Sequence, residues 1–284
     1  SSGGSSATNG LKIYIDDTSQ MQVVRRNPNG STAGQLYDPA SVPTNSGLDN
    51  GIFLRANGTL YGPSHSVRDT NFDPFFSITN FSTRSVSGPI PANPIADGTS
   101  QTAIGNFGIS GGPQLSVEYS YLRPYEFVTM TATVVIPAGY PVSTTNPVRY
   151  YHAVDTYLGG SDSGCGVKFL DSNGHRVVGT YPAVSGGCPS STSVPAGVAI
   201  VESFRERTGQ TFSHYCTAGW NDFWDRTAPY KACALSNPLS LPDTVTSTYM
   251  DTGVAIEYDF TASGTYTFSY DFVIGSTAVP AYDH

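Results

Sequence analysis

Four cysteines are the residues whose type and spacing most directly suggest chemistry. They lie at Cys165, Cys188, Cys216 and Cys233, and four cysteines allow three disulfide connectivities. We favour pairing in chain order, Cys165 with Cys188 and Cys216 with Cys233. A zinc site is the competing interpretation, but no CxxC spacing occurs and only His214 lies close to a cysteine. Disulfides form in oxidising compartments, so we expect a secreted, extracellular or cell-surface protein.

Two glutamates have the chemistry needed for acid–base catalysis on a sugar. Glu118 and Glu202 lie in segments of strand character, LSVEYSY and VESF. A carboxylate pair facing across an aromatic cleft is the arrangement of a glycoside hydrolase. Alternation along a strand gives the simpler interpretation that Glu118 is a solvent-facing surface residue. The five histidines are scattered singly and nothing local supports a nucleophile–histidine–acid triad, so we expect no catalytic residues, with glycosidase-like activity as the main enzymatic alternative.

Calcium is the metal that the acidic loops would suit. Asp155, Asp162, Asp171 and Asn173 place side-chain oxygens on glycine-containing bends, and oxygen ligands on such loops are typical of Ca²⁺ sites. The D-x-N-G sequence also makes a plain turn, because Asp and Asn bond their own backbone and Gly takes positive φ. The spacing does not match an EF-hand loop. We expect no cofactor, with calcium at these four residues as the alternative.

One compact aromatic and polar cluster is a candidate for ligand binding. Trp220 and Trp224 flank Asp222 in the sequence WNDFW, and exposed indole rings stack on sugar rings. The alternative is that both tryptophans cap the core beneath the second cysteine loop, because Trp is highly buried on average. This alternative is the one we favour.

Composition excludes several classes of function. The chain has 284 residues and carries 14 Lys and Arg against 22 Asp and Glu, a formal charge of −8. An acidic chain without a basic run is a poor candidate for binding nucleic acid. No stretch of 18 or more apolar residues occurs, so we expect no membrane span. With 30 Gly and 20 Pro, a coiled coil is excluded as well.

Hydrophobic periodicity favours strands throughout the chain. The segment FVTMTATVVI at 127–136 alternates strictly, with Thr on one face and apolar residues on the other. The best helical candidate is short, at 220–226. We therefore expect an all-β fold, a large antiparallel two-sheet sandwich of supersandwich or jelly-roll type with long loops and little helix. The expected organisation is an N-terminal leader with a possible docking or donor strand at 1–24 and one large β-sandwich domain at 25–284.

Three segments together resemble a known group of proteins. They are NGIFL at 50–54, VEYSYLRPYEFVTMTATVVI at 117–136 and RYYHAVDTYLGGSDSGCG at 149–166. With the aromatic cysteine loop and the final hairpin, they resemble uncharacterised secreted bacterial surface proteins that carry a large supersandwich-like β module. The resemblance implies a two-sheet fold and transfers no catalytic residues.

These observations favour a secreted structural or adhesive surface protein. The polar leader SSGGSSATNG precedes LKIYI, in which Leu11, Ile13 and Ile15 form an apolar face. Such a strand docks either on its own sandwich or on a neighbouring copy, which would make a self-assembling extracellular fibre. The expected partners are copies of the chain or a cell-surface or glycan partner. The alternatives are a carbohydrate-binding or glycoside-hydrolysing sandwich and a viral or phage spike or fibre protein.

Overall fold

The chain folds almost entirely into β-strands in the computed structural model, which describes residues 10–25, 50–63, 78–88, 98–157, 161–183, 187–196, 198, 201–224 and 229–275. Within these ranges there are fifteen strands, no α-helix and one short 3-10 helix, η2 (Trp220–Trp224). The strands are β1 (Leu11–Ile15), β2 (Met21–Arg25), β3 (Asn50–Ala56), β4 (Thr59–Tyr61), β5 (Thr83–Ser87), β6 (Ser100–Gly108), β7 (Gln114–Leu122), β8 (Phe127–Ile136), β9 (Val148–Asp155), β10 (Ser163–Leu170), β11 (Arg176–Pro182), β12 (Val201–Glu206), β13 (His214–Gly219), β14 (Met250–Phe260) and β15 (Gly264–Gly275). The all-β prediction is confirmed, and none of the described helices is of the length and hydropathy that a bilayer span requires.

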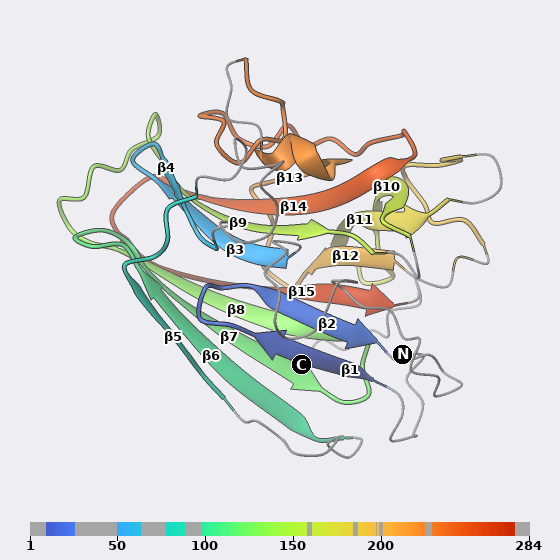
Figure 1. Cartoon of the computed structure of the whole chain (residues 1–284), viewed down its shortest axis with the longest axis horizontal. Coiled ribbons are helices and arrows are strands. Elements are labelled where there is room, and N and C mark those ends of the chain that lie inside the picture. Colours follow the sequence, from blue (N-terminus) through green and yellow to red (C-terminus); the bar gives the residue numbers. More distant parts are fainter. Residues whose placement is uncertain are drawn as a thin grey trace, which may run out of the picture.

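Thirteen of these strands form one continuous antiparallel sheet (Figure 1). The order is β4-β3-β9-β14-β10-β11-β12-β15-β8-β7-β6-β5. The remaining strand, β13, pairs with residues 252–257 of β14. The pairing of β10 with β14 is short and joins only Ser163–Gly164 to Met250–Asp251. The expected two-sheet sandwich is therefore not confirmed, because hydrogen bonds connect all thirteen strands.

The sheet bends at this short junction, so that its two parts face each other across the core (Figure 1). We call them the β14 layer (β4, β3, β9, β14 and β13) and the β15 layer (β10, β11, β12, β15, β8, β7, β6 and β5). Aromatic rings from both layers meet between them. The ring centroids of His152 and Phe204 lie 4.7 Å apart, and those of Tyr258 and Phe268 lie 4.0 Å apart. Burial of these large rings supplies most of the stabilisation of the contact.

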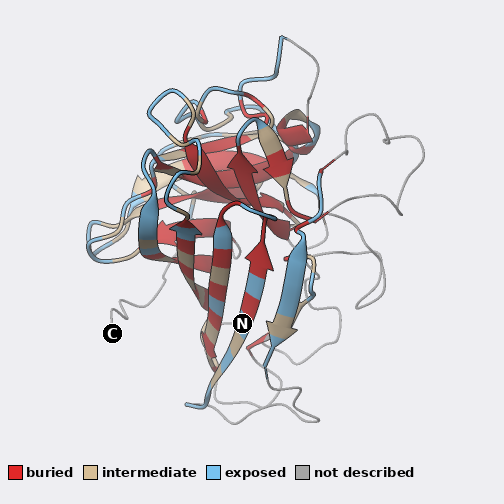
Figure 2. Ribbon diagram, turned by 90° about the vertical axis from the view of Figure 1, so that its left-hand side faces the viewer, coloured by how far each residue is buried: buried red, intermediate tan, exposed pale blue. Residues whose placement is uncertain are grey.

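Alternating side chains explain why the β15 layer has one apolar and one polar face. In β8, Met130, Ala132 and Val134 are fully buried, whereas Thr131 and Thr133 between them are partly exposed. Successive side chains of a strand point to opposite faces, so one face packs in the core and the other faces outward. Figure 2 shows the alternation as bands of buried and exposed residues along the strands.

The hairpin of β1 and β2 packs on the core of the same chain. Leu11 and Met21 belong to the main core cluster, and Ile13 and Ile15 pack against it while partly exposed. The backbone N–H of Leu11 donates to the Tyr121 hydroxyl over 2.7 Å. The candidate assembly strand is thus paired with β2 in its own chain. Residues 1–9 of the expected leader lie outside the described residues, and the expected domain boundary at residue 24 falls inside β2.

Two disulfides confirm the predicted pairing in chain order. Cys165 bonds Cys188 with a Cα–Cα distance of 5.4 Å, and Cys216 bonds Cys233 at 6.0 Å. The second bond ties β13 to a covering segment, residues 220–224 and 229–247, which we call the cover. Apolar side chains of the cover form a second core on the outer face of the β14 layer with residues of β3, β9 and β14.

Candidate functional site

The outward side of the β15 layer carries a flat array of hydroxyl and amide groups, which we call the polar face. It consists of the outward-facing residues of β5, β6, β7, β8 and β15. Strand register aligns these residues in rows across the five strands, because directly paired residues share a face. The central row is Ser85, Asn106, Ser116, Thr133 and Thr267.

Hydroxyl groups of the polar face bond one another between β8 and β15. The Thr133 and Thr267 hydroxyls lie 3.0 Å apart, and those of Thr131 and Ser269 lie 2.9 Å apart. Each hydroxyl has one donor and two acceptor positions, so these pairs leave capacity for a further partner. The array is therefore ordered within the protein and still able to bind polar ligands.

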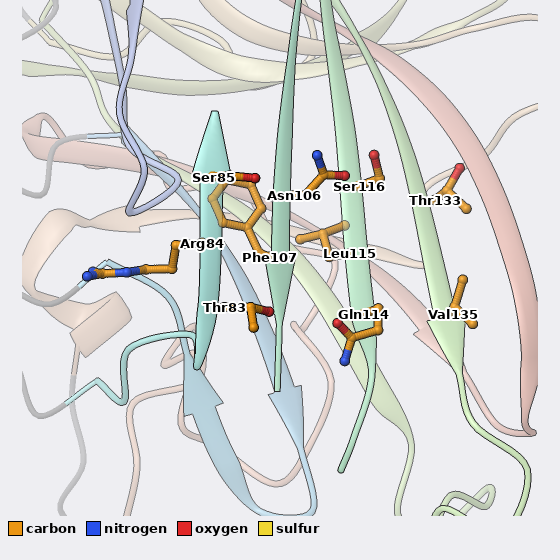
Figure 3. A pocket seen from close by; sticks show the side chains of 10 residues that line it. All are labelled: Thr83, Arg84, Ser85, Asn106, Phe107, Gln114, Leu115, Ser116, Thr133 and Val135. Carbon is orange, nitrogen blue, oxygen red and sulfur yellow. The ribbon is translucent and has the colours of Figure 1, made fainter. Parts of the chain in front are cut away.

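A groove of about 260 Å³ opens where the polar face reaches β5, β6 and β7 (Figure 3). Its rim includes Ser85, Asn106 and Ser116, whose side chains lie in a row across three strands (Figure 3). In the next row, Gly108 lies between Thr83 and Gln114. A Cβ at Gly108 would collide with both neighbouring side chains. The absence of a side chain at this position therefore lets Thr83 and Gln114 approach each other over the strand.

Gln114 is held in one orientation at this groove. Its Nε2 donates to the carbonyl oxygens of Ile109 and Gly112 over 3.2 Å and 3.0 Å. This fixes the amide and leaves Oε1 beside Gly108 and Thr83. A fixed acceptor costs less conformational entropy to engage than a mobile one, which favours ligand binding.

An ionic cluster closes the polar face at its border with β12. Asp271 is fully buried and accepts from Arg205 Nε at 3.0 Å and from an Arg207 guanidinium nitrogen at 2.9 Å. Thr129 adds a third contact, its hydroxyl donating to Asp271 at 2.8 Å. Charge-assisted bonds of this kind are stronger than neutral ones, so the cluster fixes the strands beneath the array.

The two candidate catalytic glutamates lie on opposite faces of the sheet. Glu118 is exposed on the polar face, paired with Thr131. Glu202 is paired with Ile274 and faces the core, where it accepts from the Tyr157 backbone N–H over 3.1 Å. Burial raises the pKa of Glu202 well above its ordinary value. The sequence-based hypothesis of a carboxylate pair across one cleft is therefore wrong, because the sheet separates the two groups.

The four candidate calcium ligands divide between two places. Asp155 and Asp162 lie beside the start of β14, where Asp155 pairs with Gly253. Asp171 and Asn173 lie at the far end of β10, in the turn before β11. There Asp171 Oδ1 accepts from the backbone N–H groups of Asn173 and His175, both at 2.9 Å. In the described part of the chain no group of three or more His, Cys, Asp or Glu is arranged to hold a metal. Calcium stays a prediction.

The candidate aromatic cluster belongs to the second core. Trp220 and Trp224 are 7% and 2% exposed, and their ring centroids lie 5.0 Å apart in edge contact. Trp224 also contacts Phe53 of β3, with centroids 5.4 Å apart. Asp222 is partly exposed, 3.8 Å from the Lys231 ammonium. The rings fill space between the backbone of the cover and the β14 layer, and they present no open face for stacking.

Sequence reasoning did not identify the residues of the groove. The alternating Ser and Thr of several strands were visible, but each strand alone reads as an ordinary polar face. Only the register aligns Ser85, Asn106, Ser116 and Thr133 into one row. Gly108 gave no signal of its own, because its role depends on the two side chains that flank it.

Comparisons with known proteins assign no family. No family model matches the chain, and no curated protein matches it. Among solved structures, the GH36 α-galactosidase AgaA from Geobacillus stearothermophilus matches with a TM-score of 0.35 and 10% identity over 94% of this chain. A variant of AgaA in complex with stachyose matches with a TM-score of 0.33 and 12% identity. The chain spans 40% of the length of these chains, and TM-scores this low carry no argument about activity.

Proposed function

We propose that the chain is a non-catalytic adhesive module of the extracellular space whose polar face binds neutral carbohydrate. The observation that carries the proposal is the groove of about 260 Å³ among hydroxyl and amide side chains. Sugar hydroxyls donate and accept hydrogen bonds at once, and Ser, Thr, Asn and Gln match both roles. The groove is smaller than the roughly 300–1,000 Å³ of a pocket for a whole drug-sized ligand. It therefore suits one ring of a longer glycan lying along the face.

The electrostatic character of the groove favours a neutral ligand. Arg84 is its one charged lining residue, and the remaining polar lining consists of hydroxyl and amide groups. The position of Glu202 on the core side of the sheet argues against the glycosidase alternative. The two disulfides support an oxidising compartment, where surface glycans are found.

The first test is retention on neutral polysaccharides by affinity electrophoresis and a glycan array. We expect the double variant Asn106→Ala/Ser116→Ala to bind about tenfold more weakly, since each lost hydrogen bond contributes about 0.5–1.5 kcal/mol. Exposed Asn221 lies on η2, outside the polar face, so Asn221→Ala is a matched control with unchanged affinity. Failure to bind any neutral glycan, or equal binding by the double variant, would contradict the proposal.

Self-assembly through the terminal strand is a second candidate function. Among the described strands, β1 pairs only with β2, so no described strand lies along the other edge of β1. Unpaired edges of this kind template pairing with another chain. The short strand β5 is a second such edge, at the end of the large sheet.

A further inference from the structure

A second concavity lies at the mouth between the two layers, on residues that the polar face does not include. Its volume is about 320 Å³. It spans both layers, because Lys168 comes from β10 and Arg176 from β11, whereas Tyr215 comes from β13. Thr211, Ser213 and Asp243 complete its polar lining. We call it the cationic pocket.

Two cations are gathered around one tyrosine in this pocket. The Lys168 ammonium donates to the Tyr215 hydroxyl over 2.6 Å and lies 5.1 Å from the ring centroid. The Arg176 guanidinium lies 5.5 Å from the same centroid. Cation–π attraction to the ring offsets part of the repulsion between the two cations. Tyr215 is buried, so it holds both groups in place at the pocket.

The acids nearby engage Arg176, His214 and backbone groups, and neither is paired with Lys168. Glu206 binds the Arg176 guanidinium at 3.3 Å and also accepts the Phe212 backbone N–H at 2.8 Å. Asp243 accepts from the Tyr215 backbone N–H at 3.2 Å and from His214 Nδ1 at 3.0 Å. Lys168 has no carboxylate within ion-pair distance in the described part of the chain. A half-buried ammonium of this kind attracts an external anion.

The protein as a whole carries more negative than positive charge. The chain contains 14 Lys and Arg against 22 Asp and Glu. General attraction of anions to an acidic surface is therefore unfavourable, and binding of an anion requires a specific local arrangement. The cationic pocket supplies one, with hydroxyl groups beside the ammonium.

We propose that the cationic pocket binds a carboxylate-bearing sugar, a hexuronate at or near the end of an acidic glycan. The ligand carboxylate pairs with Lys168, whereas the charge of Arg176 is already compensated by Glu206. The hydroxyls of Thr211 and Ser213 and the carboxylate of Asp243 bond the hydroxyl groups of the sugar ring. The volume is of the size of small-ligand sites, roughly 300 Å³ and above. This inference stands apart from the neutral-glycan proposal, since the two sites share no residue.

The test is isothermal titration of the intact protein with glucuronate, glucose, acetate and inorganic phosphate. We expect glucuronate to bind at least about tenfold more tightly than either glucose or acetate, since only glucuronate engages both the ammonium and the hydroxyls. Glucuronate affinity should fall as salt concentration rises. Equal binding of glucose and glucuronate would overturn the role of the charge. Phosphate binding as tightly as glucuronate would overturn the role of the sugar ring.

Variants locate the binding. Lys168→Gln should weaken glucuronate binding at least about tenfold and leave glucose binding unchanged. The matched control is Lys231→Gln, since Lys231 is exposed in the cover and lies outside the pocket. Because Lys168 also packs on Tyr215, a second variant guards against misfolding: Thr211→Val should weaken binding about two- to tenfold through the loss of one hydroxyl. Unchanged glucuronate affinity in both pocket variants would overturn the proposal, whatever their stability.

Discussion

At the scale of single residues, one hydrogen-bonded chain crosses the core between the layers. His152 Nε2 lies 2.5 Å from Asn50 Oδ1, which only accepts, so Nε2 carries the proton. His152 Nδ1 then accepts from the Tyr270 hydroxyl at 2.9 Å, and Tyr270 accepts from Tyr150 at 2.5 Å. The neutral ring is thus fully satisfied. Protonation would remove the acceptor that Tyr270 requires.

This arrangement makes stability depend on pH. Burial lowers the pKa of His152 from 6.5 to about 3, so between these values the folded protein binds fewer protons than the unfolded chain. The free energy of unfolding therefore falls as the pH is lowered, by about 2 kcal/mol from His152 alone between pH 7 and pH 5. We expect His152→Gln to remove this slope in urea unfolding curves, while lowering stability at pH 7.

The pH dependence of the wild type alone does not isolate His152, because a second buried group, Glu257, changes the stability in the opposite direction. The difference between the wild type and His152→Gln does isolate it. Burial raises the pKa of Glu257 from 4.5 to about 8, with Asp259 adding to the shift. Between these values the folded protein binds more protons, so this contribution to stability is greatest at low pH and declines as the pH rises. Identical pH profiles for the wild type and His152→Gln would refute the assignment.

At the scale of elements, strands were predictable where one face is buried. The segments at 115–121 and 127–136 alternate, and the faces expected to be apolar are buried in β7 and β8. The residues of β12 are buried on both faces, so alternation could not reveal that Glu202 faces the core. Within the helical candidate at 220–226, residues 220–224 form η2, whose aromatic side chains pack against the outer face of the β14 layer. The groove depends on the register between the consecutive strands β5 to β8, which the residue pattern of each strand taken alone does not specify.

The cover offers a direct test at this scale. The Cys216–Cys233 bond closes a sequence separation of 17 residues, and its removal is expected to cost about 3 kcal/mol of stability. Both tryptophans of the chain lie in η2, so their fluorescence reports on the cover. We expect Cys216→Ala/Cys233→Ala to shift tryptophan emission to longer wavelength, as the buried rings become hydrated.

The matched control removes the other disulfide. Cys165 and Cys188 belong to a separate small cluster with Val167 and Tyr181, away from the cover. Cys165→Ala/Cys188→Ala should therefore lower stability without changing tryptophan emission. Native-like emission in the Cys216→Ala/Cys233→Ala variant would show that packing alone holds the cover in place.

At the scale of the whole molecule, the bent sheet and the β1–β2 hairpin share one core. The hairpin contributes Leu11 and Met21 to that core, and Ser19 bonds the backbone of Ile52 in β3 over 2.8 Å. In the monomer, the hairpin therefore packs against the core of its own chain. Exchange between copies would replace these contacts with the same contacts from a neighbour.

Removal of residues 1–24 distinguishes the two arrangements. If terminal strands are exchanged, the intact protein forms concentration-dependent oligomers or filaments, and the truncated protein elutes as a monomer. The measurement is size-exclusion chromatography with light scattering, together with negative-stain microscopy. Monomers of the intact protein at every concentration would rule out self-assembly and leave the hairpin as a part of the monomer core. The control is Leu239→Ala in the intact protein, because Leu239 is exposed and its replacement should change neither the elution nor the images.

The position of β15 has a consequence for how the protein is made. β15 is the last described strand in the sequence, yet in the sheet it lies between β12 and β8. A polypeptide delivered from its N-terminus therefore holds β8 and β12 with open edges until residues 264–275 emerge. Open edges of this kind recruit other chains, so products that end before this point are targets for aggregation or degradation. The sheet can therefore be completed only after residues 264–275 have been synthesised.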